Sequence, residues 1–420
     1  MPLWMIPMSY TLVSVLGAFL FPRLEYLLNP TYQMPLAPAS AQSFLATVAS
    51  GMMALTGIVF SIAFVMVQFM AVAYSPRLVQ WFGRDKTLYH AMGIFIATFM
   101  YSLATLVWVD RNSSGQVPFA SMWLVVMLLF ASMFLFARLV QRLTSLQITH
   151  VLQFIGARGR AVIHETFPHG ADVAAVIEAA EEARGDLGPV TQTLRYEGTP
   201  RSIARFDIQA LVRQASQADA IIVLDSAVGD TMVDDTVILR VYGARAALAE
   251  RPLLKAVHLS DERTFEQDPK YPLRLLVDIA IRALSPAIND PTTAVQALDQ
   301  IEDLLRRMAK CRLDAGYARD AGGRLRLVFP MPTWSDYLTL SFDEIRFYGA
   351  DSVQVMRRLR SALTGLLDSV TAPSRAASVR SYLAHLDRMV EASRMDADDK
   401  AMARREDRQG LGLSRGADGG

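Results

Sequence analysis

The chain has 420 residues, of which 52% are hydrophobic and 20% are charged, and its mean hydropathy is +0.24. Its second half is too polar for a chain that lies in the membrane throughout, so we expect a hybrid of two regions. The formal net charge of +1 provides no overall field for nucleic acid or an acidic substrate. The single cysteine, Cys311, cannot form an internal disulfide, which fits a reducing compartment for that part of the chain.

Four apolar stretches occupy the first third of the chain, at residues 3–21, 44–73, 88–109 and 119–139. Each is close to or longer than the roughly 20 residues that cross a bilayer, so each predicts a membrane-spanning helix. Apart from Arg138, next to the end of the fourth stretch, none contains Asp, Glu, Lys or Arg, which argues against a pump or a transporter of charged solutes. No basic residue precedes the first stretch, so we interpret it as a retained helix rather than a signal peptide and leave open a start further upstream.

Basic residues in the short loops predict the orientation of these helices. Arg77, Arg84 and Lys86 lie between the second and third stretches, whereas Arg23 and Arg111 stand alone in the other two loops. The basic side is expected to be cytoplasmic, which places both termini and the polar half there, at the plasma (inner) membrane of a bacterium. The lipid bilayer is then an obligatory partner.

Small residues form a stripe along the second stretch, at the positions Ala46, Ser50, Ala54, Gly57 and Ser61. Such a stripe lets another helix approach closely, and helix packing is its simplest interpretation. The alternative is that the stripe, with Gln68, Thr98 and Tyr101, lines a polar pathway in a homo-oligomer.

The polar half is expected to be an α+β cytoplasmic domain. We predict a helical connector at 141–190, formed by a helix that continues the fourth span towards residue 154 and a second helix at 172–184. Short β-branched runs predict a β-rich subdomain at 191–250, similar to a small β-barrel or sandwich of the biotinyl-carrier type, although it has no lysine that could carry a cofactor. A helical subdomain at 251–395 follows, with helices at 273–284, 294–310, 334–348, 352–370 and 374–394, and then a disordered tail at 396–420.

Two neighbouring features of the helical subdomain are candidates for ligand binding. Arg274, Asp278 and Arg282 recur along one strip of a buried helix, where they either satisfy each other's charge or leave one arginine for an anion. The segment after this helix contains Ser285, Asn289, Asp290, Thr292 and Thr293. Asp290 suits a helix N-cap and is followed by a proline, so capping explains the pattern, while the helix N-terminus could also bind an anion.

The longest motif runs from Leu259-Ser260-Asp261-Glu262-Arg263-Thr264-Phe265-Glu266-Gln267-Asp268-Pro269 through the 273–280 helix to Ser285-Pro286-Ala287-Ile288-Asn289-Asp290-Pro291-Thr292-Thr293. It resembles the core signature of the bacterial predicted-membrane-protein family called domain-of-unknown-function family 2254. Residues 74–78, 93–101 and 342–346 support the resemblance. The family implies N-terminal spans with a cytoplasmic domain and brings no established activity, but it raises the interest of residues 268–293.

We find no nucleotide-binding glycine loop, zinc-type spacing or nucleophile elbow, so we expect neither an enzyme nor a cofactor or metal. His258 with the acids at 261–268 is the densest acidic cluster. A hydrolytic or metal site is the alternative there, and a solvated loop is the simpler interpretation. Two functions are favoured over an enzyme. The first is an oligomeric channel or passive transport protein gated by its cytoplasmic domain. The second is a membrane-anchored sensor or scaffold that binds a ligand or partner at the loop from Ser285 to Thr293.

Overall fold

The computed structural model describes residues 3–28, 36–73, 86–111, 116–144, 147–167, 187–313, 316–408 and 410. The chain divides into two compact units, residues 1–147 and residues 148–420. Two predicted segments, the helix at 172–184 and the motif at 74–78, lie outside the described residues.

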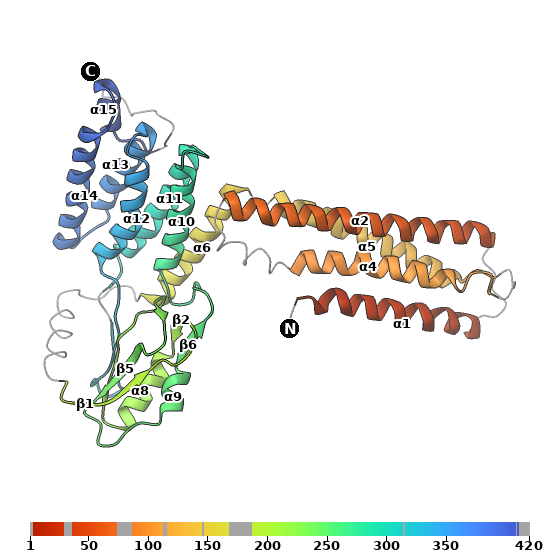
Figure 1. Cartoon of the computed structure of the whole chain (residues 1–420), viewed down its shortest axis with the longest axis horizontal. Helices are drawn as coiled ribbons and strands as arrows, with labels where there is room; N and C mark the ends of the chain where they lie inside the picture. Colours follow the sequence, from red (N-terminus) through yellow and green to blue (C-terminus); the bar gives the residue numbers. More distant parts are fainter. Residues whose placement is uncertain are drawn as a thin grey trace. The chain divides into compact units, whose positions relative to one another are not determined.

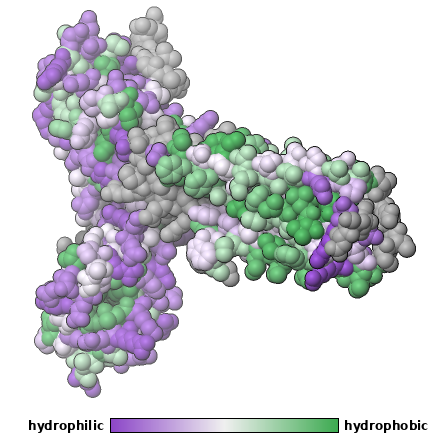
Figure 2. All heavy atoms as spheres, turned by 45° about the vertical axis from the view of Figure 1, so that its right-hand side comes forward, coloured by the Kyte–Doolittle hydropathy of each residue, from purple (hydrophilic) through white to green (hydrophobic). Residues whose placement is uncertain are grey.

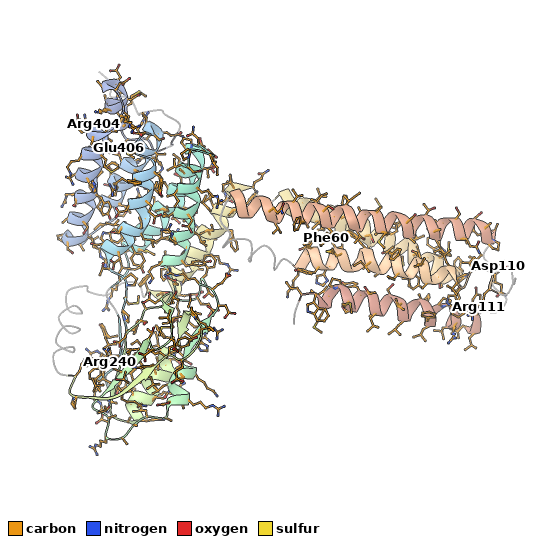
Figure 3. The ribbon with its side chains drawn as sticks, viewed as in Figure 1. Phe60, Asp110, Arg111, Arg240, Arg404 and Glu406 are labelled. Atoms are coloured by element: carbon orange, nitrogen blue, oxygen red, sulfur yellow. The ribbon has the colours of Figure 1, made fainter. Side chains whose placement is uncertain are left out.

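The described part of unit 1 contains the helices α1 (Met5–Leu28), α2 (Pro38–Ala73), α4 (Lys86–Leu106) and α5 (Phe119–Thr144). All four are long and apolar enough to cross a membrane, which confirms the four predicted spans. Figure 2 shows hydrophobic side chains along much of the outward surface of these helices, as lipid contact requires. Phe60 of α2, which is labelled in Figure 3, is one of them, with 58% of its surface exposed.

Helix α4 packs against each of the other three helices of unit 1 (Figure 1). The interior contains small and aromatic residues of α1 and α4, among them Ala18, Ala91 and Phe95. Helix α1 extends seven residues beyond the predicted end and therefore contains Arg23 and Glu25, in contrast to the predicted charge-free span. The Glu25 carboxylate accepts a 2.8 Å hydrogen bond from the backbone N–H of Ala120, so it caps the N-terminus of α5 and satisfies an otherwise unpaired donor.

The β-rich part of unit 2 contains two sheets. The larger has the order β1-β5-β3-β8-β7, built from β1 (Val190–Arg195), β5 (Val237–Tyr242), β3 (Ile221–Leu224), β8 (Leu325–Val328) and β7 (Tyr317–Arg319). All pairs are antiparallel except β3 with β8. The smaller sheet has the order β4-β2-β6, built from β4 (Thr231–Met232), β2 (Arg201–Phe206) and β6 (Val257–Ser260). The short helices α8 (Ile208–Gln217) and α9 (Glu250–Lys255) accompany the sheets.

The helical part of unit 2 contains α6 (Ile148–Thr166), α10 (Lys270–Ala283), α11 (Pro291–Met308), α12 (Trp334–Tyr348), α13 (Val353–Leu367), α14 (Pro373–Ala392) and α15 (Ala397–Ala403). Helices α10 and α11 lie at its centre and pack against α6, α12 and α13 (Figure 1). The predicted helix at 334–348 is confirmed as α12, which begins at a capping box between Thr333 and Asp336. The predicted helices at 352–370 and 374–394 are confirmed as α13 and α14, and an ion pair between Arg360 and Asp387 joins them.

Three predictions about unit 2 are wrong. The expected helix that continues the fourth span is divided into α5 and α6, with residues 145–147 between them. Residues 396–408, which were predicted to belong to a disordered tail, are ordered, because Asp396 caps α15 and the side chain of Asp407 is buried near Arg357. Strands β6, β7 and β8 fall in the stretch predicted to be helical. In β8, Arg326 is buried between Asp219 and Asp320, and a buried arginine conceals the apolar pattern of that strand.

Candidate functional site

The predicted loop from Ser285 to Thr293 uses much of its hydrogen-bonding capacity internally. The Ser285 hydroxyl donates to the backbone oxygen of Arg282 at 2.7 Å. The Asp290 carboxylate accepts from the backbone N–H of Thr293 at 3.1 Å and from the Thr293 hydroxyl at 2.6 Å, which confirms the predicted N-cap. Asn289 has a φ of +48° and, like Thr292, is exposed. The loop therefore forms a closed turn that starts α11.

The predicted strip on α10 is completed by a residue from another helix. Arg274 contacts Asp278 at 2.5 Å and forms two parallel hydrogen bonds with Glu344 of α12, at 2.5 and 2.8 Å. These bonds lower the pKa of Glu344 below its ordinary value and raise that of Arg274. The half-buried Arg282 takes part in none of the ion pairs seen among the described residues. The predicted charge pairing on α10 is therefore present between Arg274 and Asp278, and Arg274 also joins α10 to α12 through Glu344.

The structure places the predicted pore or packing residues on two different surfaces. Ser50, Ala54, Gly57, Ser61 and Gln68 of α2 are exposed, and no described atom lies within 4 Å of a Cβ built on Gly57. In contrast, Thr98 and Tyr101 of α4 are buried inside unit 1, where the Thr98 hydroxyl lies 3.1 Å from that of Ser132. The outward face of α2 and the interior of unit 1 therefore do not form one continuous lining.

The acidic cluster is dispersed on the surface, except for Asp268. Asp261 pairs with Arg201, and Glu266 pairs with Arg205, both with exposed side chains. Among the described residues no group of three or more His, Cys, Asp or Glu side chains could hold a metal ion. Asp268, by contrast, is only 1% exposed.

Asp268 lines a cavity of about 280 Å³ between the sheets and the helices of unit 2. The end of α6, the end of β2, the start of α10, strand β7, the segment after β8 and the first turn of α12 all contribute to its wall. The lining is mostly apolar and includes Phe167, Phe206, Ile208, Val228, Tyr317, Phe329, Pro330, Met331 and Pro332. It also contains the polar residues Thr166, Asp268, Lys270 and Tyr337.

Two of the residues that line this cavity have a buried hydroxyl group with no hydrogen-bond partner among the described residues. The two hydroxyls are Tyr337 Oη, on a side chain with 0% exposure, and Thr166 Oγ1. A buried polar group without a partner costs free energy, and such groups are few in folded proteins. Burial, with the charge of Asp268 adding to it, raises the pKa of Tyr337, so its hydroxyl keeps its proton at neutral pH.

The carboxylate of Asp268 has partners on both oxygens. Its Oδ2 accepts from Arg263 Nε at 2.6 Å, and its Oδ1 accepts from the backbone N–H of Lys270 at 3.1 Å. Burial raises the pKa of Asp268, although Arg263 acts in the opposite direction. Gly229, which has a φ of +87°, packs so closely that a Cβ there would collide with Arg263 and Asp268.

Gln267 fixes the loop that carries Asp268. Its side-chain oxygen accepts from the backbone N–H of Phe206 at 2.9 Å, and its nitrogen donates to the Phe206 oxygen at 3.2 Å. The Phe265 ring packs edge-to-face on Tyr271, with the centroids 4.9 Å apart. The loop is thereby attached to the end of β2 on one side and to the start of α10 on the other.

No predicted site falls in this cavity, although Gln267 and Asp268 belong to the motif that carries the family resemblance. That motif is the signal that could have indicated it. Tyr337 and Thr166 lie on distant helices that have ordinary apolar patterns, so no local pattern marks them.

Four spanning helices followed by an α+β unit define an integral membrane protein with a large polar domain, in contact with the lipid bilayer. The chain belongs to the family described as "Predicted membrane protein (DUF2254)", which matches residues 1–365. It is 28% identical over 374 residues to uncharacterized proteins of Mycobacterium tuberculosis strain H37Rv and Mycobacterium bovis, covering 87% of this chain and 71% of each relative. No solved structure matches the chain.

Proposed function

We propose that this protein is a membrane-anchored sensor that binds a small ligand in the cavity between Asp268 and Tyr337. The observation that carries the proposal is the unpartnered hydroxyl of Tyr337, which is fully buried in the wall of a mostly apolar cavity. Ligand sites are typically apolar cavities with a few oriented polar groups. The family motif supplies Gln267 and Asp268 to the same wall, which links the cavity to the part of the chain that resembles the family.

Helix α6 is a route by which the ligand site could influence the spans. Thr166 and Phe167, at its C-terminal end, line the cavity, and its first residue, Ile148, follows the last residue of α5 after three residues. The predicted continuous helix is absent, so this coupling would depend on α6 moving as a rigid body against α11.

The test of the proposal is a binding screen on the full-length protein in lipid nanodiscs. A bacterial metabolite extract is applied, and retained molecules are identified by mass spectrometry. Ala318→Leu adds three carbon atoms at the cavity wall and should abolish retention, whereas Ala157→Leu, at an exposed position of α6, should not. Equal retention by the Ala318→Leu protein and the unchanged protein would contradict a ligand site in this cavity.

The oligomeric channel is a second candidate, supported by the exposed small-residue face of α2. Ser50, Ala54, Gly57 and Ser61 leave that face without a helix of the same chain among the described residues, and close helix approach requires such small residues. Thr98 and Tyr101 are enclosed in unit 1, so a pore between subunits would be lined by α2. Gly57→Leu should dissociate the oligomer in nanodiscs, and a monomer for the unchanged protein would eliminate this candidate.

A further inference from the structure

We infer that the ligand of the cavity is a small uncharged molecule with an apolar body and one hydrogen-bond acceptor, such as a ketone or amide carbonyl. This inference rests on the proposed function and names the chemistry that the same site would recognise.

The size of the cavity restricts the ligand to a small molecule. Ligand pockets commonly measure about 300–1,000 Å³, and this cavity, at about 280 Å³, is slightly smaller than that range. The aromatic and aliphatic side chains of Phe206, Ile208, Phe329 and Met331 surround it. A ring or short chain would bury its surface against them, and the hydrophobic effect would supply most of the affinity.

The two unpartnered hydroxyls favour a hydrogen-bond acceptor as the polar group of the ligand. Tyr337 keeps its proton, and Thr166 Oγ1 is a second donor without an acceptor among the described residues. A hydroxyl can also accept, but buried backbone N–H donors without acceptors are rarer in native structures than under-satisfied carbonyl oxygens, and we expect the same of hydroxyl donors. An acceptor atom on the ligand would satisfy one or both hydroxyls, whereas a pure hydrocarbon would leave them unpaired.

The charges at the cavity disfavour an ionised ligand. Asp268 would repel an anion at short range in a poorly hydrated site. A cation would have to compete with Arg263, which already holds Oδ2 of Asp268 at 2.6 Å. Lys270 lies 3.9 Å from Asp230, and Glu165 is exposed, so the charged groups around the cavity are close to balance. An unpaired buried ion is costly, and a neutral carbonyl avoids that cost.

Four probes test this inference, each with one benzene ring and a different substituent: acetophenone, ethylbenzene, benzoate and benzylamine. Their binding is measured by saturation-transfer NMR on the full-length protein in nanodiscs. Empty nanodiscs and Ala318→Leu nanodiscs correct for partition into lipid. We expect acetophenone to give the strongest signal that Ala318→Leu removes. Tyr337→Phe should weaken its binding about three- to tenfold, the effect of one hydrogen bond.

Different failures identify different errors. If benzoate or benzylamine binds more tightly than acetophenone in an Ala318-sensitive way, the inferred ligand chemistry is overturned while a ligand site in the cavity stands. Binding of acetophenone that Tyr337→Phe leaves unchanged, in a protein that melts normally, would also overturn it, because the hydroxyl would then have no part in recognition. Absence of an Ala318-sensitive signal from acetophenone overturns the inference, and if the metabolite screen fails as well, the proposed function fails with it.

Discussion

The hydroxyl of Tyr337 is buried without a partner among the described residues, while the hydroxyl of Tyr382, on the neighbouring helix α14, lies 2.9 Å from that of Thr339. Both tyrosines belong to the helical part of unit 2. A hydrogen-bonded hydroxyl stabilises the fold, whereas a buried hydroxyl without a partner does not. Removing the hydroxyl by a Tyr→Phe substitution should therefore change the stability in opposite directions at the two positions.

We predict that Tyr337→Phe raises the stability of the ligand-free protein by about 1 kcal/mol, because it removes an unpaired buried group. For a unit of this size this corresponds to roughly 2–4 °C in the apparent Tm. The matched variant Tyr382→Phe should leave the Tm unchanged or lower it. Thermal unfolding of the purified protein checks this, and a clear loss of stability in Tyr337→Phe would show that its hydroxyl has a partner.

The ion pair of Glu344 predicts how the stability of the protein depends on pH. Its hydrogen bonds with Arg274 lower its pKa in the folded state, so the stability that they contribute is complete above the pKa of the unfolded chain. It is lost as the pH falls through the lowered folded pKa. The side chain of Glu344 is 43% exposed, so solvent screening reduces the effect to about 1 kcal/mol.

The expected result for Glu344→Gln is lower stability than the unchanged protein at pH 7, with a difference that shrinks towards pH 3. Thermal melts across this pH range measure the difference. If the difference in melting temperature between the two proteins stays constant with pH, the negative charge of Glu344 does not contribute to stability.

At the scale of elements, two glycines let α6 lie against α11. A Cβ on Gly159 would lie 2.7 Å from Leu304 Cδ1 and 3.2 Å from Pro272 Cβ, and a Cβ on Gly156 would collide with the Gln300 side chain. The apolar face of α6, which includes Val151, Leu152 and Ile155, is buried as a result. The contact between α6 and α11 therefore depends on the lack of a side chain at Gly156 and Gly159 as much as on the apolar side chains.

We predict that Gly159→Val destabilises the protein by about 1–3 kcal/mol, the usual cost of overpacking. Ala157→Val places the same β-branched residue at an exposed position of the same helix and controls for the lower helix propensity of valine. Equal melting temperatures for the two variants would mean that α6 can withdraw from α11 without cost.

At the scale of the whole molecule, the proposed orientation places both termini in the cytoplasm of a bacterium. Arg111, in the loop after α4, would then be outside, and Asp398 in α15 would be inside (Figure 3 labels Arg111). The native Cys311 is 3% exposed, and burial raises the pKa of its thiol, so it should react little.

A membrane-impermeant maleimide should therefore label Arg111→Cys in intact cells, and Asp398→Cys only after permeabilisation. The unmodified protein, which contains only Cys311, is the control for background. Labelling of Asp398→Cys in intact cells would reverse the orientation inferred from the basic loops.

Local patterns in the sequence were sufficient for the four spans, the α12 boundaries and the Asp290 cap, because apolar periodicity and capping depend on residues close in the chain. The motif around Asp268 also marked the correct region. Only the tertiary structure decided that Tyr337 lines the same cavity as Asp268, that β8 joins β3 in one sheet, and that the small-residue face of α2 is exposed. A cavity, a strand order and an exposed face arise from packing between distant segments, and neighbouring residues do not encode that packing.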